Sequence, residues 1–454
     1  MNKFIKDWRR VGLITTLAFF LLAGIFQQKI SAQGNNCDCV PNEVIFELLV
    51  PANLSAVAAQ YGLNPSPLGQ VGTPPTFRMQ ITSGQTPAQI VAAMANDGRI
   101  TKPEVNRKLS AAEREGLPWT IGHSWSIGHS WSIGGSAKGF SKQWFPKKIR
   151  LDEAHNHPQG SRGAGVIIAV LDTGIDLTHP AFAGKLVPGY DFVADDANPS
   201  EEGVLRQNPS HGHGTHVAGI IALTAPDAKI MPLRVLNPNG EGELWRVTQA
   251  LIWAANNGAT IVNLSFGYPD NADLLKDLID DADDGITADG KDFPEIGSNK
   301  LAVVIGAGNG GNALPIFPAA EDLNGSIGVG ASTRNELLAG FSSYDRSWVE
   351  VTAPGENIVS AIPGGRYGVW SGTSMSAPIV SGIAALVKSK NPNLTPHDLL
   401  DRVKETSVDK RYTDSVRGEI RLKRVDALCA VLNIISCSLP ADADNNGFEK
   451  FVLK

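Results

Sequence analysis

Short apolar segments that alternate with longer, helix-like segments constrain the fold of this chain more than any other feature. Strands that are buried on both faces of a sheet have such nearly continuous apolar runs. The alternation predicts an α/β domain with a three-layer, doubly wound, mostly parallel sheet, and a site beyond the carboxyl ends of the strands. The strand-like segments are Val166–Leu171, Ile230–Val235, Thr260–Leu264 and Leu301–Ile305, and the helix-like segments are His213–Leu223, Leu244–Asn256 and Ser374–Ser389.

A serine stands at the expected first turn of the last of these helices, within the segment Ser371–Pro378. A serine hydroxyl is a poor nucleophile at its own pKa, so a catalytic serine needs a general base and donors for the oxyanion that its attack creates. If Ser374 is a nucleophile, the chain must therefore supply a histidine, an acid and a second oxyanion donor.

Candidates for all three groups lie upstream of the serine. Asp172 follows an unbroken apolar run, so its carboxylate is expected at the carboxyl end of a buried strand. His213 stands in a glycine-rich approach to an apolar helix, and Asn309 follows a second buried strand that breaks into glycines. The leading hypothesis is therefore a hydrolase.

These four motifs, with the acid, the base and the nucleophile in the order Asp, His, Ser, resemble those of the subtilisin-like serine proteases, the subtilase family. The resemblance implies that Ser374 attacks the scissile carbonyl, that His213 takes its proton and that Asp172 fixes the imidazole tautomer. Asn309 and the backbone N–H of Ser374 would hold the oxyanion. It further implies that two edge segments bind an extended substrate by strand addition. The candidate substrate-binding residues are Gly240, Gly242, Ser265, Phe266, Gly267 and Gly308.

The same resemblance places the floor of the main specificity pocket near the segment Ile316–Pro318. If Ile316 points inward, it shortens the pocket and favours small or medium apolar side chains in the substrate. The matched wall segments contain no acidic residue that would favour Lys or Arg. Efficient cleavage after arginine would contradict this expectation.

Each motif also has an interpretation without catalysis. The sequence Asp-Thr-Gly is common in turns, and a serine among small residues often only packs a helix. His211, His213 and His216 are spaced closely enough to suggest a metal site, but no Cys or acidic partner lies nearby in the sequence. A catalytically silent subtilisin-fold protein that binds peptides is the alternative function, and a general esterase is the alternative among hydrolases.

The N-terminus has the pattern of an export signal. Basic residues between positions 3 and 10 precede the apolar run Val11–Phe26, and Ile30-Ser31-Ala32 offers a small-residue cleavage point. The apolar run is shorter than the ~20 residues of a spanning helix. We therefore predict a signal peptide over residues 1–32 and a secreted protein, with an uncleaved membrane anchor as the alternative.

Residues 41–109 are predicted to form a separate small domain. Its segments alternate twice between strand-like and helix-like patterns, which favours an α+β unit of the ferredoxin-like, split βαβ type. The unit resembles the inhibitory prosegment of subtilases, which implies a zymogen that processes itself and a prodomain that acts as an intramolecular inhibitor. A plain accessory domain is the alternative. The segments are Glu43–Val50, Leu54–Tyr61, Thr76–Ile81 and Pro87–Asn96.

Residues 110–142 are predicted to be a linker, because Ile121–Ser126 recurs as Ile127–Ser132 in a stretch rich in glycine and serine. Maturation cleavage is expected between Leu109 and Lys142. The predicted catalytic domain covers residues 143–432, and residues 433–454 are a C-terminal tail.

Charge and composition limit the classes of molecule that the protein is expected to bind. The net charge is −6 and no basic block dominates, so nucleic acid is not an indicated partner. We expect a monomer that acts on protein or peptide substrates without a required cofactor. Ala181 stands where many relatives carry a calcium-binding Asp, so that site is expected to be absent. A cluster of carboxylates before Asn309 could hold a structural calcium ion, with a solvated acidic loop as the alternative. The cluster comprises Asp280, Asp281, Asp283, Asp284, Asp289, Asp292 and Glu295.

The four cysteines suit an exported protein. Cys37 and Cys39 are expected to be too close in sequence for an easy mutual bridge, whereas Cys429 and Cys437 could close a short C-terminal loop.

Overall fold

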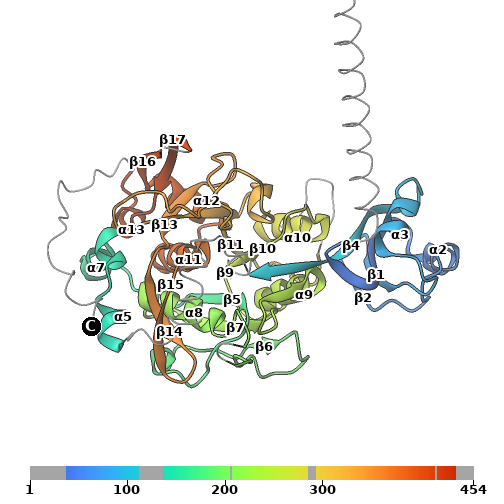
Figure 1. Cartoon of the computed structure of the whole chain (residues 1–454), viewed down its shortest axis with the longest axis horizontal. Helices are drawn as coiled ribbons and strands as arrows, with labels where there is room; N and C mark the ends of the chain where they lie inside the picture. The colour runs from blue at the N-terminus through green and yellow to red at the C-terminus, as the bar shows by residue number, and fades with distance from the viewer. Residues whose placement is uncertain (1–36, 112–135, 205–206, 285–292, 415–416, 436–454) are drawn as a thin grey trace, which may run out of the picture. The chain divides into compact units, whose positions relative to one another are not determined.

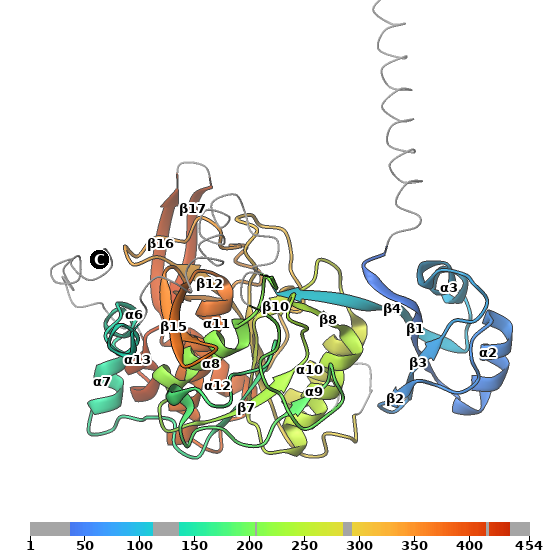
Figure 2. The same ribbon diagram turned by 60° about the horizontal axis from the view of Figure 1, so that its bottom comes forward.

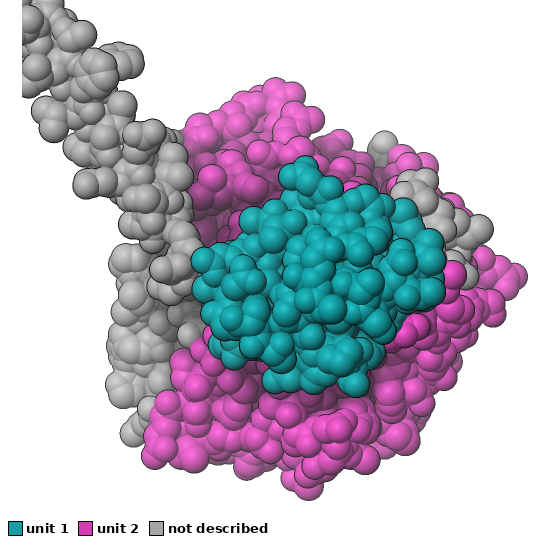
Figure 3. All heavy atoms as spheres, turned by 90° about the vertical axis from the view of Figure 1, so that its right-hand side faces the viewer, with its two compact units in different colours: residues 1–69, 77–106 teal, residues 70–76, 107–454 magenta. Residues whose placement is uncertain are grey.

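The computed structural model describes residues 37–111, 136–204, 207–284, 293–414 and 417–435. The chain divides into two compact units, which Figure 3 shows in different colours. Unit 1 contains residues 1–69 and 77–106, and unit 2 contains residues 70–76 and 107–454. No helix within the described ranges is long and apolar enough to cross a membrane, and the predicted signal peptide lies outside those ranges.

Unit 2 is built on a mostly parallel sheet, as the apolar segments predict. Nine strands of the described chain follow each other across this sheet in the order β16-β17-β13-β12-β11-β9-β5-β7-β6. Only β16 runs antiparallel to its neighbour. The bounds are β5 Ile167–Asp172, β6 Tyr190–Asp191, β7 Lys229–Arg234, β9 Ile261–Leu264, β11 Ala302–Gly306, β12 Ser326–Ser332, β13 Val351–Pro354, β16 Val408–Asp414 and β17 Gly418–Arg424.

Helices pack onto this sheet (Figures 1 and 2), and α8 and α11 contact each other as well as the strands. The predicted strand and helix segments of this unit match the observed bounds to within one residue at each end. The helices are α5 Ala137–Ser141, α6 Phe145–Lys148, α7 Leu151–Asn156, α8 His213–Thr224, α9 Leu244–Asn256, α10 Asp273–Asp284, α11 Thr373–Lys390, α12 Pro396–Glu405 and α13 Ala427–Leu432, and a hairpin is formed by β14 Ile358–Ile362 and β15 Arg366–Trp370.

The core of unit 2 explains why α8 and α11 are buried on nearly all sides. Val170 of β5, Ile220 of α8 and Ile379 of α11 belong to one apolar cluster and are at most 1% exposed. Because α8 and α11 are apolar on several faces, burial between the sheet and neighbouring helices removes most of their surface from water. The same packing holds the first turns of both helices in place.

Unit 1 has its own core of Phe46, Met79, Ile90 and neighbouring apolar residues. The elements between residues 39 and 111 follow in the order strand, helix, strand, strand, helix, strand, and Gln70, Val71, Thr76 and residues 107–111 of these strands belong to unit 2. The side chain of Thr86 caps the second helix and forms a capping box with Gln89, which stabilises the helix start. The bounds are β1 Cys39–Leu48, α2 Leu54–Tyr61, β2 Gly69–Val71, β3 Thr76–Gln80, α3 Pro87–Met94 and β4 Ile100–Ala111.

One expectation about the cysteines is wrong. Cys37 and Cys39 form a disulfide, with their Cα atoms 5.2 Å apart. That separation lies within the range of about 4.4–6.8 Å that disulfides need, and a bend of the backbone at Asp38 brings the two cysteines this close. The Cys429–Cys437 pairing stays a prediction, because Cys437 lies outside the described residues.

Candidate active site

The acid and the base predicted from the sequence lie side by side. Asp172 ends β5, His213 begins α8, and both side chains are buried. His213 Nδ1 donates to Asp172 Oδ1 over 2.7 Å. Since an ionised carboxylate only accepts hydrogen bonds, this contact keeps the proton of a neutral imidazole on Nδ1 and leaves Nε2 as the basic atom.

Gly214 allows the start of α8 to lie close to Asp172. A Cβ on Gly214, the second residue of α8, would lie 3.0 Å from Asp172 Cβ and would overlap the carbonyl oxygen of Gly174. The backbone N–H of Gly214 instead donates to Thr173 Oγ1 over 3.0 Å. The glycine-rich sequence around His213 is therefore what lets the helix start against the end of β5.

Ser374 lies in the first turn of α11 and is fully buried. Its Oγ donates to the carbonyl oxygen of Ser265 over 3.1 Å, and Ser265 Oγ donates back to the carbonyl oxygen of Ser374 over 3.1 Å. This reciprocal pair ties the start of α11 to the segment that follows β9. The position of the serine is thus set by strand β9 as well as by its own helix.

A tryptophan brings α11 and α8 into one site. Trp370 ends β15, four residues before Ser374, and its ring centroid lies 5.4 Å from that of His213 and 5.0 Å from that of His216. Ring pairs at such separations are favourable. The indole therefore packs the segment that leads to the serine against the helix that carries the histidine.

Asn309 follows β11, and hydrogen bonds hold the oxygen of its side-chain amide in place. Asn309 Oδ1 accepts from the backbone N–H of Thr373 over 2.9 Å and from Thr373 Oγ1 over 3.1 Å. Because these contacts identify the oxygen of the side-chain amide, Nδ2 is the donor end of the group. An amide held in this way beside the residue that precedes Ser374 has the chemistry of an oxyanion donor.

Two edge segments of unit 2 hold an extended strand between them. Residues 107–111 of β4 belong to this unit and pair antiparallel with β8 Glu241–Glu243 and with β10 Phe266–Gly267. The backbone N–H of Ala111 also donates to the carbonyl oxygen of Gly240 over 2.8 Å. Figure 2 shows the end of β4 beside β8 and β10. The segments that the sequence assigns to substrate binding thus hold a peptide strand.

Ile316 points toward the expected pocket wall. It is half-buried, and its Cγ2 lies 2.5 Å from where a Cβ on Gly267 would stand. Its Cγ1 lies 2.9 Å from the corresponding position on Gly308. Phe317 exchanges backbone hydrogen bonds of 2.8 and 2.9 Å with Tyr268, which holds this segment beside β10. Ile316 therefore packs against Gly267 and Gly308, and a short, apolar pocket stays a prediction.

The neighbouring histidines have separate roles. His216 Nε2 lies 3.2 Å from the carbonyl oxygen of Ile358, whereas His211 Nδ1 lies 2.7 Å from that of Glu202. Burial, together with the neighbouring His213, lowers the pKa of His216 to about 3, so this ring is neutral at ordinary pH. The three histidines each contact a different group, which fits a structural role for the outer two.

In the cluster of carboxylates before Asn309, one side chain forms a hydrogen bond with another part of unit 2. Asp283 Oδ1 accepts from the backbone N–H of His397 over 2.9 Å, while Asp289 and Asp292 lie outside the described residues. Within the described ranges, no group of three or more His, Cys, Asp or Glu side chains is arranged to bind a metal ion. A structural calcium ion at this cluster of carboxylates stays a prediction.

Glu201 is a residue that the sequence argument missed. Its Oε2 accepts from Thr215 Oγ1 over 2.8 Å and from the backbone N–H of Thr215 over 3.2 Å, in the first turn of α8. Burial raises the pKa of Glu201 to about 7 against the opposing effect of hydrogen bonds, and the charge of Asp172 adds to the increase. Two adjacent glutamates in a polar loop look solvent-exposed in the sequence, so no local pattern reveals this burial.

The free energy of unfolding is expected to fall as pH rises, and replacing Glu201 by Gln is expected to reduce this fall. The folded pKa of about 7 lies above the ordinary value of 4.5, so the folded state holds the proton longer and stability falls as pH rises from 4.5 through 7. The effect is at most about 3 kcal/mol. Urea denaturation at pH 5 and pH 8, in a Ser374→Ala background that prevents autolysis, measures it.

The matched control is Glu153→Gln, because Glu153 is an exposed glutamate of α7. That variant should keep the pH dependence of the parent. An equal slope in the Glu201→Gln variant and its parent would contradict the buried-carboxyl interpretation.

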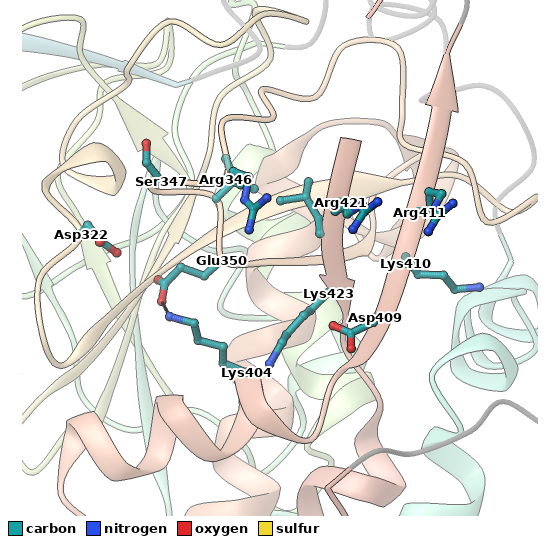
Figure 4. Close-up of a pocket in the computed structure, with 12 residues that line it drawn as sticks. Asp322, Arg346, Ser347, Glu350, Lys404, Asp409, Lys410, Arg411, Arg421 and Lys423 are labelled. Atoms are coloured by element: carbon teal, nitrogen blue, oxygen red, sulfur yellow. Dashed lines mark hydrogen bonds and ion pairs between the residues drawn. The ribbon is translucent and has the colours of Figure 1, made fainter. Parts of the chain in front are cut away.

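Figure 4 shows a cavity elsewhere in unit 2, with a volume of about 610 Å³. Charged residues from α12, β16 and β17 dominate its lining, and Lys404 pairs with Glu350 there over 2.6 Å. None of the predicted catalytic or substrate-binding residues lines this cavity. The candidate site is therefore the group of residues around Ser374 and not this cavity.

Most of unit 2 matches a known protein family. Residues 163–424 match the subtilase family, Peptidase S8. The chain is 39% identical over 262 residues to a thermophilic serine proteinase from Bacillus sp. (strain AK1), a match that covers 55% of this chain and 58% of that protein. It is 37% identical over 261 residues to thermitase from Thermoactinomyces vulgaris, covering 55% of this chain and 83% of the relative.

The fold is also similar to that of a solved structure. Fervidolysin from Fervidobacterium pennivorans, described as a keratinolytic enzyme related to subtilisin, aligns with a TM-score of 0.65 and 21% identity over 87% of this chain and 62% of that one. At this identity the likeness concerns the fold alone.

Proposed function

Because the chain belongs to the subtilase family of serine-type endopeptidases, we propose that it hydrolyses peptide bonds of proteins with Asp172, His213 and Ser374 as its catalytic triad. The observation that carries the proposal is the 2.7 Å contact between His213 Nδ1 and Asp172 Oδ1, in a site that Trp370 joins to the segment before Ser374.

In the proposed mechanism, Ser374 Oγ attacks the carbonyl carbon of the scissile bond and His213 Nε2 takes the hydroxyl proton. His213 then gives this proton to the leaving amine as the C–N bond breaks, which leaves an acyl-enzyme. A water molecule attacks the ester with His213 again as base, and the acid product leaves. Asp172 stays ionised throughout and stabilises the imidazolium. The reaction requires no cofactor.

We propose that Asn309 Nδ2 and the backbone N–H of Ser374 stabilise the oxyanion of each tetrahedral intermediate. The anchoring of Asn309 Oδ1 by Thr373 supports this role, since it prevents rotation of the amide. Such preorganised donors stabilise the charge that develops in the transition state without having to reorient.

Replacing Asn309 by Ala is expected to lower kcat by about 100 to 1000-fold, equivalent to roughly 2.7–4 kcal/mol, with little change in KM. The reason is that the amide contacts an oxygen whose charge exists only in the transition state. Steady-state kinetics with a chromogenic peptide measures the two constants.

Asn312→Ala is the control, because Asn312 lies three residues further along and its side chain accepts from the backbone N–H of Leu314 over 2.9 Å. Its kcat should stay within a few-fold of wild type. A rise in KM alone after the change at Asn309 would contradict the oxyanion role.

We also propose that the chain is a secreted, monomeric zymogen. Residues 1–32 would be the export signal, residues 41–109 the inhibitory prodomain, residues 110–142 the linker, residues 143–432 the catalytic domain and residues 433–454 the tail. The presence of residues 107–111 in the substrate groove, directly after unit 1, supports self-inhibition. A peptide-binding protein without catalysis is the alternative, since the same groove would serve it.

Labelling with a fluorophosphonate, followed by a casein assay, separates the two functions. An activated serine reacts with this probe, whereas an ordinary serine does not. For the enzyme we expect one adduct, on the peptide that contains Ser374, and a matching loss of casein hydrolysis. Heat-unfolded protein should remain unlabelled. Unlabelled native protein without caseinolytic activity would favour the peptide-binding alternative.

A further inference from the structure

A loop ahead of α8 is fastened to the loop that follows β5. The backbone N–H of Ile175 donates to the carbonyl oxygen of Pro199 over 3.1 Å, and the backbone N–H of Glu201 donates to the carbonyl oxygen of Ile175 over 3.1 Å. These two hydrogen bonds hold the segments side by side. Glu201 is therefore fixed close to the end of β5, where Asp172 lies.

The carboxyl group of Glu201 is bound to the first turn of α8. Its Oε2 accepts from Thr215 Oγ1 over 2.8 Å and from the backbone N–H of Thr215 over 3.2 Å. A hydrogen bond from the backbone N–H of Gly212 also lowers the pKa of this carboxyl group. Gly212 and Thr215 lie on either side of His213 in the sequence. Because a helix start has N–H groups without partners in the helix, a carboxylate there stabilises the turn.

Thr173 connects the same carboxyl group to the proposed acid. The Thr173 hydroxyl accepts from the backbone N–H of Gly214 over 3.0 Å, and its hydrogen bond with Glu201 lowers the pKa of that glutamate. The backbone N–H of Thr173 donates to Asp172 Oδ1 over 2.7 Å. This oxygen also accepts from His213. A chain of hydrogen bonds thus leads from Glu201 through Thr173 to Asp172, and from there to the imidazole.

We propose that Glu201 is a positioning residue of the active site: its carboxyl group joins the end of β5 to the first turn of α8, and its negative charge stabilises the imidazolium that His213 forms during catalysis. The inference deepens the proposed function and rests on it. Glu201 acts on the reaction only through the pair of Asp172 and His213, so it is not itself a catalytic residue.

The surroundings of Glu201 explain why its charge changes near neutral pH. The residue is half-buried, but Oε1 of its carboxyl group is buried. Burial is the largest cause that raises the pKa of Glu201 to about 7, and the charge of Asp172 acts in the same direction. Within the described ranges no ion pair joins Glu201 to a cation, so hydrogen bonds alone oppose these two effects.

The nearest cation on the sheet is already neutralised by other carboxylates. Arg234 of β7 donates to Asp191 Oδ2 and to Glu202 Oε2, each over 2.6 Å. The ionisable groups on the segments packed against Glu201 are Asp172 at the end of β5, Asp176 in the loop after it, His211 and His213 at the start of α8, and Glu202 with its partner Arg234.

The sign of the expected effect follows from these charges. A negative charge near an imidazole favours the protonated ring and raises its pKa. Ionised Glu201 therefore stabilises the imidazolium above pH 7, whereas protonated Glu201 at lower pH does not. Replacing Glu201 by Gln removes the charge and keeps the shape of the side chain. We expect the pKa of His213 to fall by about 0.5–1 unit.

The first measurement follows the Nδ1 proton of His213 by NMR between pH 5 and pH 9. It uses the full chain with Ser374→Ala, with and without Glu201→Gln. A proton held between an imidazole and a carboxylate resonates far downfield and shifts when the ring is protonated, so its titration gives the pKa of His213. This measurement requires neither a substrate nor catalysis.

The second measurement compares kcat and KM of the wild type and Glu201→Gln across the same pH range, with a chromogenic peptide. We expect kcat of the variant to be about three- to tenfold lower at pH 9 and less than twofold lower at pH 6, with little change in KM. A general disturbance of the structure would instead lower kcat by a similar factor at every pH.

Glu350→Gln is the matched control. Burial also raises the pKa of Glu350, which accepts from the backbone N–H of Gly328 over 3.1 Å and pairs with Lys404 over 2.6 Å. Glu350 lines the cavity of Figure 4, which none of the proposed catalytic residues lines. The variant should lose stability and keep both the pKa of His213 and the pH profile of kcat.

A second pair of variants tests the inference if Glu201→Gln does not fold. Thr215→Val removes the hydroxyl group that donates to Glu201, which makes ionisation of the carboxyl group less favourable. It should therefore lower the pKa of His213 in the same direction. Thr215→Ser keeps the hydroxyl group and should restore the wild-type pKa.

The outcomes separate this inference from the proposed function. If the pKa of His213 does not fall in Glu201→Gln, or if kcat falls by the same factor at every pH, the inference is overturned and the protease function stands. If the wild type hydrolyses neither the peptide nor casein, the proposed function fails, and the role of Glu201 in catalysis fails with it.

Discussion

Replacing Ser374 by Ala is expected to lower kcat for peptide hydrolysis on the order of 10⁴-fold or more, with little change in KM. The variant loses the nucleophile but keeps the groove and the oxyanion donors, which alone sustain only weak catalysis by water. Initial rates with a chromogenic peptide measure the loss. The fold should survive, because removing one hydroxyl group from the first turn of a buried helix leaves almost no cavity.

Ser376→Ala is the matched control, because Ser376 lies two residues further along the same helix. Its Oγ donates to the carbonyl oxygen of Ala353 over 3.0 Å. Losing this hydrogen bond should reduce stability by about 1 kcal/mol while leaving kcat within a few-fold of wild type. Equal losses of activity in both variants would assign the effect to the helix start as a whole and not to the nucleophile.

Replacing Asp172 by Asn is expected to lower kcat by about 10⁴-fold while the fold is retained. The carboxylate keeps the imidazole proton on Nδ1 through the 2.7 Å contact. An asparagine can instead turn its amide N–H toward Nδ1, which moves the ring proton to Nε2 and removes the base that Ser374 needs. Steady-state kinetics and the rate of fluorophosphonate labelling of Ser374 should fall together.

Asp176→Asn provides the comparison, since Asp176 lies in the same loop and accepts from the backbone N–H of Gly364 over 2.8 Å. That variant should lose stability but keep kcat within about tenfold, because its carboxylate contacts backbone groups and not the imidazole. Should Asp172→Asn also stay within tenfold of wild type, Asp172 would not be the residue that orients His213.

The main sheet and its helices could be predicted because their signal is local. Continuous apolar runs such as Val166–Leu171 occur where a strand is covered on both faces, and this property belongs to the segment itself. The predicted bounds of α9, Leu244–Asn256, coincide with those observed. The four chemical motifs could likewise be located, since each follows a buried strand or opens a buried helix.

The features that the sequence did not reveal depend on the three-dimensional path of the backbone, even where the contacting residues are close in the sequence. Glu201 looks like a surface residue until the loop folds against Thr215, and only that contact buries its carboxylate. Sequence separation does not predict the bridge between Cys37 and Cys39, because bridging depends on the distance between the Cα atoms, which is 5.2 Å in the folded chain.

The sequence by itself determined the α/β class of unit 2, the subtilase family motifs and the candidate triad residues, because strand and helix periodicity and motif spacing are properties of the linear chain. The tertiary structure alone decided that residues 107–111 of β4 pair with β8 and β10 and that Ile316 lies against Gly267 and Gly308. The physical reason is that strand pairing and side-chain packing are set by partners that only the folded chain brings together, whose approach no local pattern encodes.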